Sequence, residues 1–255
     1  MQPEIAAQLL EINRRFYHEF GASFASTRRR IQPGVRRIVQ RLPKDGKWLD
    51  LGCGNGALAV EWAHQGHSGL YIGMDFSTPL LEEALHAIQA ISHPQLKMHL
   101  LAVDFSQPEN LLPTAQAFCQ EGFDGALMFA TLHHLPTETL RRRLLLNIHT
   151  LLKPNGVFIH SVWQFQNSPK IWARRVLWET VGLNPADLEA GDTLLDWRHT
   201  LPGESPRSGL RYVHLFSEEE LRTLATDCGF TIAEQFLSDG QSGNLGLYQV
   251  WHKTS

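Results

Sequence analysis

Residues 48–56, with the sequence WLDLGCGNG, combine a short apolar run containing an acid with glycines at every second position. Gly52, Gly54 and Gly56 carry no Cβ, so the backbone there can turn sharply and approach a ligand closely. A strand that breaks into such a loop is typical of the α/β sheets that bind nucleotides. The third glycine comes one residue earlier than in the dinucleotide pattern G-x-G-x-x-G, and a plain strand-to-helix turn would also satisfy this spacing.

A second apolar run, residues 70–75, ends in Asp75. Its separation from the glycine loop is about that at which a βαβ unit places the carboxylate that binds a ribose. A carboxylate can accept hydrogen bonds from both ribose hydroxyls, because its two oxygens present several lone pairs. Residues 77–79, STP, open a helix, so a helix-capping role is the alternative explanation for Asp75.

A third apolar run, residues 98–103, ends at Asp104, and Phe105 follows. A glycine loop and two acids at successive strand ends resemble the class I S-adenosylmethionine (SAM) methyltransferases, whose ligand carries an amine and a carboxylate but no phosphate. The resemblance implies that Asp50 lies near the amine and that Asp104 and Phe105 flank the adenine. It also adds Ala130, which follows the fourth expected strand, to the residues that bind SAM.

Length and composition set the class of protein. A chain of 255 residues can fold as one α/β domain with a full core, and 43% hydrophobic and 19% charged residues are ordinary for a globular protein. No apolar run approaches the roughly 18 residues that span a bilayer, and residues 1–20 are amphipathic, so we expect a cytoplasmic enzyme without membrane contact. The three scattered cysteines build neither a disulfide framework nor a Cys-x-x-Cys site, and we expect no metal.

The formal net charge of −3 conceals a basic N-terminal segment. Residues 1–49 hold ten Lys or Arg against four acids: Arg14, Arg15, Arg28, Arg29, Arg30, Arg36, Arg37, Arg41, Lys44 and Lys47 against Glu4, Glu11, Glu19 and Asp45. Clustered cations can follow a phosphate backbone, so the segment permits nucleic-acid binding. A solvated helical face explains the same charges at least as well.

We expect one domain over residues 1–255, built on a seven-stranded, mostly parallel sheet that an antiparallel hairpin closes. Its segments are an N-terminal helical cap (1–44), a SAM-binding core (45–162), an insertion after the fifth strand (163–215) and a C-terminal helix with the hairpin (216–255). The expected elements include helices at 5–20, 33–41 and 138–152, a turn at 153–156, and strands at 123–129, 157–162, 231–237 and 245–252. The insertion shows little periodicity, and so long a stretch in a compact α/β domain is usually functional.

Longer strings along nearly the whole chain resemble the tRNA wobble-uridine carboxymethyl methyltransferases. They are the approach from Phe16-Tyr17 to Arg28, the segment FDGALMFATLHHLPT with His133-His134, Arg141-Arg142, Val162-Trp163, DTLLDW (192–197) and RYVHLF (211–216). Three positions depart from the family: Asp196 replaces a proline, Pro33-Gly34 stand in for a Pro-Trp pair, and Leu245-Gly246 for a terminal aromatic pair. These departures concern the substrate and leave cofactor binding untouched.

The resemblance implies transfer of a methyl group from SAM to the carboxylate of 5-carboxymethyluridine at the tRNA wobble position, which gives a methyl ester. A carboxylate with an ordinary pKa of about 4 is already ionised at neutral pH, so no general base is needed. Alignment with the methyl donor and electrostatic steering should supply the catalysis. Arg28 and Arg211 are our candidates for holding the carboxylate or a neighbouring phosphate, and His133 and His134 for holding the carboxylate or the uracil.

Aromatic residues could complete the site. Trp163 and Trp197 could stack on a splayed anticodon base, Tyr17 could cover the cofactor, and His214 is a further, weaker candidate for the substrate. For each of these residues, packing in the protein core is about as good an explanation.

Two other functions stay open. A methyltransferase of a small carboxylic acid or another metabolite would share the fold and the cofactor, and the net acidity of the chain favours it. A SAM-binding subunit without activity of its own is the third alternative, which the intact glycine loop and the His-His pair disfavour. Eukaryotic members of the resembled family work with a small zinc-binding activating subunit, and the sequence does not tell whether this chain has such a partner.

Overall fold

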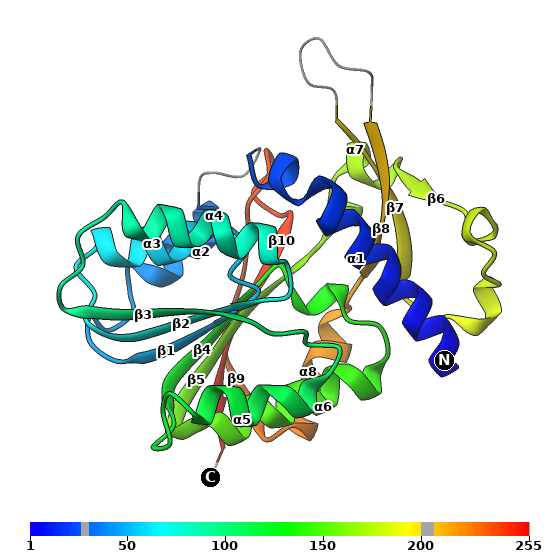
Figure 1. Ribbon diagram of the computed structural model, residues 1–255. Coiled ribbons are helices and arrows are strands. Elements are labelled where there is room, and N and C mark those ends of the chain that lie inside the picture. Colours follow the sequence, from blue (N-terminus) through cyan, green and yellow to red (C-terminus); the bar gives the residue numbers. More distant parts are fainter. Residues whose placement is uncertain (27–30, 200–206, 255) are drawn as a thin grey trace.

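A seven-stranded sheet of order β3-β2-β1-β4-β5-β10-β9 runs through the molecule (Figure 1). The computed structural model describes residues 1–26, 31–199 and 207–254. The strands of this sheet are β1 (Lys47–Leu51), β2 (Gly69–Asp75), β3 (Leu96–Ala102), β4 (Phe123–Phe129), β5 (Leu152–Trp163), β9 (Phe230–Ser238) and β10 (Gly246–Lys253). β10 pairs antiparallel with β5 and with β9, and the other neighbours are parallel. The arrangement confirms the predicted fold class.

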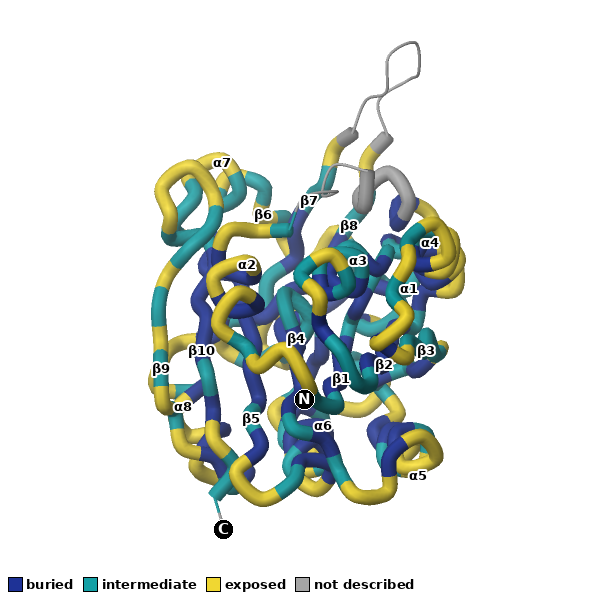
Figure 2. Tube along the Cα trace, turned by 90° about the vertical axis from the view of Figure 1, so that its left-hand side faces the viewer, coloured by how far each residue is buried: buried dark blue, intermediate teal, exposed yellow. Residues whose placement is uncertain are grey.

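Helices cover both faces of this sheet (Figure 1). One face carries α2 (Pro33–Val39), α3 (Ala57–His64) and α4 (Thr78–Gln89), and the other carries α5 (Leu111–Gln116), α6 (Glu138–Leu151) and α8 (Glu218–Asp227). Successive side chains of a strand point to opposite faces, so on β1 Trp48 packs towards α2 and α3 while Leu49 packs towards α6. The sheet is therefore buried on both sides, and its strand ends are the places left for a site (Figure 2).

The element boundaries follow the sequence with a few differences. α1 (Pro3–Ser26) continues beyond the expected end at residue 20, and α2 ends at Val39 instead of residue 41. β5 begins at Leu152, directly after α6, and not at residue 157 as predicted. The turn expected at 153–156 is present as an irregularity in pairing, because Phe123 pairs with Leu152 while Gly125 pairs with Val157.

The insertion after β5 forms a small antiparallel sheet, which the sequence analysis did not predict. The sheet has the order β6-β7-β8, with β6 (Arg175–Val176), β7 (Asp192–His199) and β8 (Arg207–His214), and α7 (Pro169–Trp172) precedes it. Neighbouring β7 residues Leu194 and Leu195 are both buried, because both faces of this sheet are covered. A strand buried on both faces has no alternating pattern, so periodicity could not reveal it.

α1 lies across β8 and joins the insertion to the strand ends of the large sheet (Figure 1). The side chain of Asn13 on α1 accepts a hydrogen bond from the Tyr212 amide at 2.9 Å and donates to the Tyr212 carbonyl at 3.1 Å. Short 3-10 helices complete the described chain at Pro108–Asn110, Leu132–His134, Phe165–Asn167, Trp178–Val181 and Pro185–Asp187. Over the described residues, each helix is too short or too polar to cross a bilayer. The division of the chain into four segments stays a prediction.

Candidate active site

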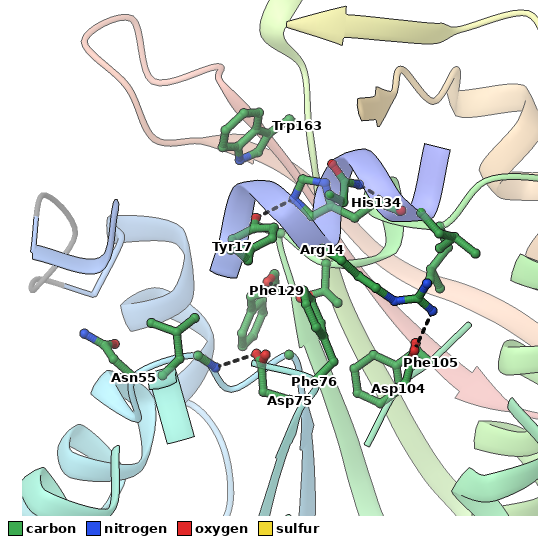
Figure 3. A pocket seen from close by; sticks show the side chains of 18 residues that line it. Arg14, Tyr17, Asn55, Asp75, Phe76, Asp104, Phe105, Phe129, His134 and Trp163 are labelled. Carbon is green, nitrogen blue, oxygen red and sulfur yellow. Dashed lines mark hydrogen bonds and ion pairs between the residues drawn. The ribbon is translucent and has the colours of Figure 1, made fainter. Parts of the chain in front are cut away.

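A cavity of about 220 Å³ lies over the carboxyl ends of β1 to β4 (Figure 3). Its floor holds the glycine loop, Asp75 and Asp104, and α1 forms its roof. The roof residues are spaced by three or four positions, as one face of a helix requires: Leu10, Asn13, Arg14 and Tyr17. The cavity is the first of two that meet at these strand ends, and it contains most of the predicted cofactor residues.

The glycine loop takes the backbone conformation that its sequence predicts. Gly52, Gly54 and Gly56 have φ angles of 84°, 53° and 74°, in the region that side chains with a Cβ rarely adopt. A Cβ on Gly52 would lie 2.1 Å from Oγ1 of Thr131, so the loop and the end of β4 approach too closely for any other residue. A Cβ on Gly54 would meet nothing within 4 Å, because this part of the loop faces the cavity.

Asp75 holds the loop and faces the cavity with the same carboxylate. Its Oδ2 accepts a hydrogen bond from the Gly54 amide and its Oδ1 one from the Ser77 amide, each at 2.9 Å. Burial raises the pKa of Asp75 above its ordinary value, and these hydrogen bonds partly offset the effect. A carboxylate has about four lone-pair sites, so two stay available for a pair of ribose hydroxyls. The ribose-binding and helix-capping explanations are therefore compatible.

Asp104 is held by a residue that sequence reasoning missed. Arg14 on α1 donates to Asp104 at 2.7 Å (Figure 3). It also donates to the Ser106 hydroxyl at 3.0 Å. Partial burial raises the pKa of Asp104, but hydrogen bonds from Ser106 and Arg14 outweigh it and hold the pKa below its ordinary value. Phe105 and Phe76 line the same part of the cavity, so an ionised acid stands beside two apolar rings, which suits a flat heterocycle with an exocyclic amine.

A second cavity of about 410 Å³ lies on the other side of the glycine loop, between α2 and β10. The two cavities share one wall, made by Gly52, Phe129, Ala130 and Trp163. Ala130 has a φ of 51°, and its amide donates to the Ser161 carbonyl at 3.0 Å. Strained backbone of this kind persists where the surrounding structure enforces it, often at ligand sites.

Asp50 belongs to the second cavity. It is almost fully buried and accepts a hydrogen bond from the hydroxyl of Tyr71. Burial raises its pKa to about 7, the Tyr71 hydrogen bond opposes that shift, and the charge of Asp75 adds to it. A buried acid in this position favours a cation, and the amine of SAM is such a group.

His134 and Tyr17 form a hydrogen-bonded pair over the first cavity (Figure 3). Nδ1 of His134 lies 3.1 Å from the Tyr212 carbonyl, and its Nε2 lies 2.9 Å from the Tyr17 hydroxyl. A carbonyl can only accept, so Nδ1 carries the proton, and in the neutral ring Nε2 then accepts from Tyr17. The imidazole thereby joins α1 to β8 instead of standing as a free base.

Arg211 on β8 is buried next to this pair. Its guanidinium lies 4.4 Å from the ring centre of Trp163 and 5.1 Å from that of Phe16. Burial lowers its pKa, with Tyr17 opposing the shift, but an arginine remains charged in proteins. A positive charge is thus held between aromatic rings behind the shared wall of the two cavities.

The structure does not bring His133 or Trp197 to the cavities. His133 is fully buried, and its Nδ1 lies 3.4 Å from the amide of Trp163. Trp197 packs against Phe16 and Phe20 of α1, with ring centres 5.5 and 5.1 Å apart. Arg28 lies outside the described residues, so its predicted role is not addressed by the structure.

His214 lies in a separate buried network. Its Nδ1 is 2.8 Å from Asp192 and its Nε2 is 2.9 Å from Glu220. Burial lowers its pKa, but the hydrogen bonds to the two carboxylates outweigh burial and raise the pKa above its ordinary value. Ligand atoms of Glu189, Asp192 and His214 lie within 4.8 Å of one another, as a metal would require. Arg141 already lies 2.6 Å from Glu189 and 3.3 Å from Glu220, so a cation of the chain is already paired with carboxylates of this network.

The fold and the glycine loop, together with the two acids that face the cavity, define a SAM-dependent methyltransferase of class I. Residues 24–235 match the family model described as a methyltransferase domain. The chain belongs to this methyltransferase family, and SAM is its methyl donor.

Known proteins similar to this chain include tRNA-modifying enzymes. A tRNA (carboxymethyluridine(34)-5-O)-methyltransferase of Arabidopsis thaliana is 29% identical over 161 residues, which is 63% of this chain and 34% of that protein. The protein of that name from Schizosaccharomyces pombe is 24% identical over 232 residues, 86% of this chain and 88% of that protein. The chain thus spans about a third of one of these relatives and most of the other.

A solved structure supports the fold independently of these sequences. The crystal structure of 1,6-didemethyltoxoflavin-N1-methyltransferase of Burkholderia thailandensis, with 1,6-didemethyltoxoflavin and S-adenosylhomocysteine bound, superposes with a TM-score of 0.63. The match covers all of this chain and 92% of that one, at 21% sequence identity. At this identity the likeness concerns the fold alone.

Proposed function

We propose that this protein transfers the methyl group of SAM to the carboxylate of 5-carboxymethyluridine at the wobble position of tRNA. The observation that carries the proposal is the buried guanidinium of Arg211, which stands behind Trp163 and Tyr17, two residues that line the first cavity. A cation in that place attracts an anionic acceptor, and a carboxylate is such a group. The names of the similar Arabidopsis and fission-yeast enzymes support tRNA as the molecule that bears it.

Charged residues of the chain would place SAM and the acceptor in different parts of the site. Bound SAM supplies a methyl carbon made electrophilic by a sulfonium. Asp75 would hold its ribose, Asp104 with Phe105 its adenine, and Asp50 its amine. The acceptor carboxylate would lie near Arg211, so that opposite charges are brought together at the wall near Ala130.

No residue of the site needs to remove a proton in this reaction. The acceptor carboxylate is ionised at neutral pH, since an ordinary carboxylic acid has a pKa of about 4. The hydrogen bonds of His134 agree with a reaction that has no general base, because its two ring nitrogens are engaged with Tyr212 and Tyr17. Arg211 should not contact the attacking oxygen tightly, or it would stabilise the free acceptor more than the transition state. Its aromatic neighbours keep it behind the wall.

The test is methyl transfer from labelled SAM to bulk tRNA, with a metabolite extract in a parallel reaction. The proposal expects label in tRNA, located by nucleoside mass spectrometry at the wobble uridine, and released as labelled methanol by mild alkali because an ester is hydrolysed there. An Arg211→Lys variant should keep part of the activity, and Arg211→Met should lose it while still binding SAM. Label that is stable to alkali, or label confined to the extract, would refute the proposal.

A small-molecule carboxylate is the second candidate acceptor. The formal net charge of −3 favours it, because a polyanionic RNA is repelled by an acidic protein. So does Asp196, which adds a carboxylate where the resembled family has proline. Label confined to the metabolite extract, and absent from tRNA, is the result expected for this alternative. A tRNA acceptor agrees with the cytoplasmic location expected from the sequence, which stays a prediction.

A further inference from the structure

The insertion presents a short basic surface, which we call the α7–β6 surface and define as residues 169–176. It carries Lys170, Arg174 and Arg175 within six positions, and Lys170 and Arg175 are exposed while Arg174 is half-buried. In the described parts of the chain, no carboxylate lies within 4.0 Å of these three cations. The nearby acid Asp196 is already paired with Arg198, at 2.5 Å.

Several other exposed arginines of the described chain are paired with acids. On α6, Arg142 pairs with Glu138 and Asp227, and Arg143 pairs with Glu109. Arg222 on α8 pairs with Glu219. These exposed ion pairs cancel their own charge, whereas the α7–β6 surface keeps a net positive charge that an external anion can use.

The cations of this surface sit on a rigid base. Arg175 stacks on Trp172, with its guanidinium carbon 3.4 Å from the ring centre, and its Nε donates to the Trp172 carbonyl at 3.1 Å. Its backbone pairs with Leu195 of β7. A guanidinium already fixed in this way loses little rotamer freedom when it binds an anion, and stacking leaves its charge intact.

The surface is also connected to the site. Ile171 and Trp172 pack against the buried cluster that contains Trp163 and Leu195. Trp163 lines both cavities, and Leu245 of the same cluster lines the second one. Charges on the α7–β6 surface therefore lie beside the wall at which the acceptor would be methylated.

We propose that the α7–β6 surface binds the phosphate backbone of the RNA whose wobble base enters the site. This inference rests on the proposed function, because it assumes an RNA acceptor. Cations without bound acids, held on a rigid aromatic base beside the site, match the sequence-independent part of RNA recognition. The base itself would be recognised at the cavities, and this surface would set the position of the strand.

The experiment measures binding of bulk tRNA to the full chain by fluorescence anisotropy, over a range of salt concentrations. The test variant replaces Lys170, Arg174 and Arg175 by Ala, and the control variant replaces Arg142, Arg143 and Arg222 by Ala, with the same loss of charge. If all three test residues contact phosphates, the plot of the logarithm of the association constant against the logarithm of the salt concentration should become shallower by about 2. The dissociation constant at 0.1 M salt should rise about 100-fold. The control should stay within about threefold of the wild type.

Two further measurements separate the possible failures. SAM binding by calorimetry should be equal in the three proteins, and a variant with Arg174→Lys and Arg175→Lys should keep the wild-type salt slope, because phosphate contacts need the charge and not the guanidinium shape. If the test variant binds tRNA as tightly as the wild type and with the same salt slope, the inference is overturned and the proposed function still stands. A wild type that binds no tRNA and methylates none would overturn both.

Discussion

Replacing Asp75 by Asn tests whether the first cavity holds the nucleoside of SAM. The Asp75 carboxylate accepts the amides of Gly54 and Ser77, each at 2.9 Å, and its remaining lone pairs face the cavity. An asparagine has the same shape but only one acceptor oxygen, and its amide nitrogen must face one of the two backbone N–H groups. The substitution therefore removes the charge from the site and one acceptor from the loop.

The expected loss follows from the difference between charged and neutral hydrogen bonds. A hydrogen bond to a charged acceptor contributes about 1.5–3 kcal/mol and a neutral one about 0.5–1.5 kcal/mol, so two ribose hydroxyls lose together about 2–3 kcal/mol. This corresponds to a dissociation constant for SAM that is raised about 30-fold to 150-fold. Burial raises the pKa of Asp75, which means that its buried charge is unfavourable before any ligand binds. Removing the charge recovers part of this cost, so the expected loss of affinity stays within this range.

The assay is isothermal titration calorimetry with SAM and, separately, S-adenosylhomocysteine at neutral pH. Asp45→Asn is the matched control, because Asp45 is exposed, hydrogen-bonds Ser68 and lies before β1, at the opposite end of the strands. The control should bind both ligands as the wild type does. Affinity of Asp75→Asn within twofold of the wild type, in a protein with unchanged melting temperature, would refute the assignment of this carboxylate to the ribose.

Two more substitutions probe the loop and the buried histidine. Gly52→Ala should abolish measurable SAM binding, because its Cβ would lie 2.1 Å from Thr131 at a φ of 84°. The control Gly66→Ala has a φ of 73° and nothing within 4 Å, so it should cost only backbone strain of about 1–2 kcal/mol, measured by denaturant unfolding. Equal effects of the two substitutions on SAM binding would contradict this. The folded-state pKa of His214 is raised, so its stabilising contribution is complete below the unfolded pKa of about 6.5 and is lost as pH rises through the folded pKa. The free-energy advantage of the wild type over His214→Gln should accordingly shrink from pH 6 to pH 9, and a pH-independent difference would disprove it.

The sequence predicted those parts of the site that are local in the chain. The conformation of Gly54 depends on its own missing Cβ, and Asp75 lies at a strand end that the apolar run marks. Both therefore appear where the pattern places them. The same holds for the parallel sheet, since each strand is a short apolar run bounded by turn residues.

Of the roof residues, the sequence analysis expected only Tyr17 over the cofactor, because the others depend on contacts between distant segments. Arg14 reaches Asp104 across 90 positions, and His134 reaches Tyr212 across 78. One signal was present: positions 10, 13, 14 and 17 share a helix face, and that face holds Asn13 and Arg14 besides the apolar residues. Polar residues on an otherwise buried helix face indicate buried partners, but a single sequence does not identify them.

The charges of the two cavities constrain the direction from which an anionic acceptor enters. Asp50 and Asp239 line the second cavity, whereas Arg211 lies behind Trp163. An anion that entered through the second cavity would meet carboxyl groups in a partly buried space, where like charges about 4 Å apart repel by several kcal/mol. The side of Trp163 leads instead towards the Arg211 guanidinium, and it is the side on which the α7–β6 surface packs. An acceptor that approaches from this side would pass the basic surface, so removing the surface should weaken RNA binding without altering SAM affinity.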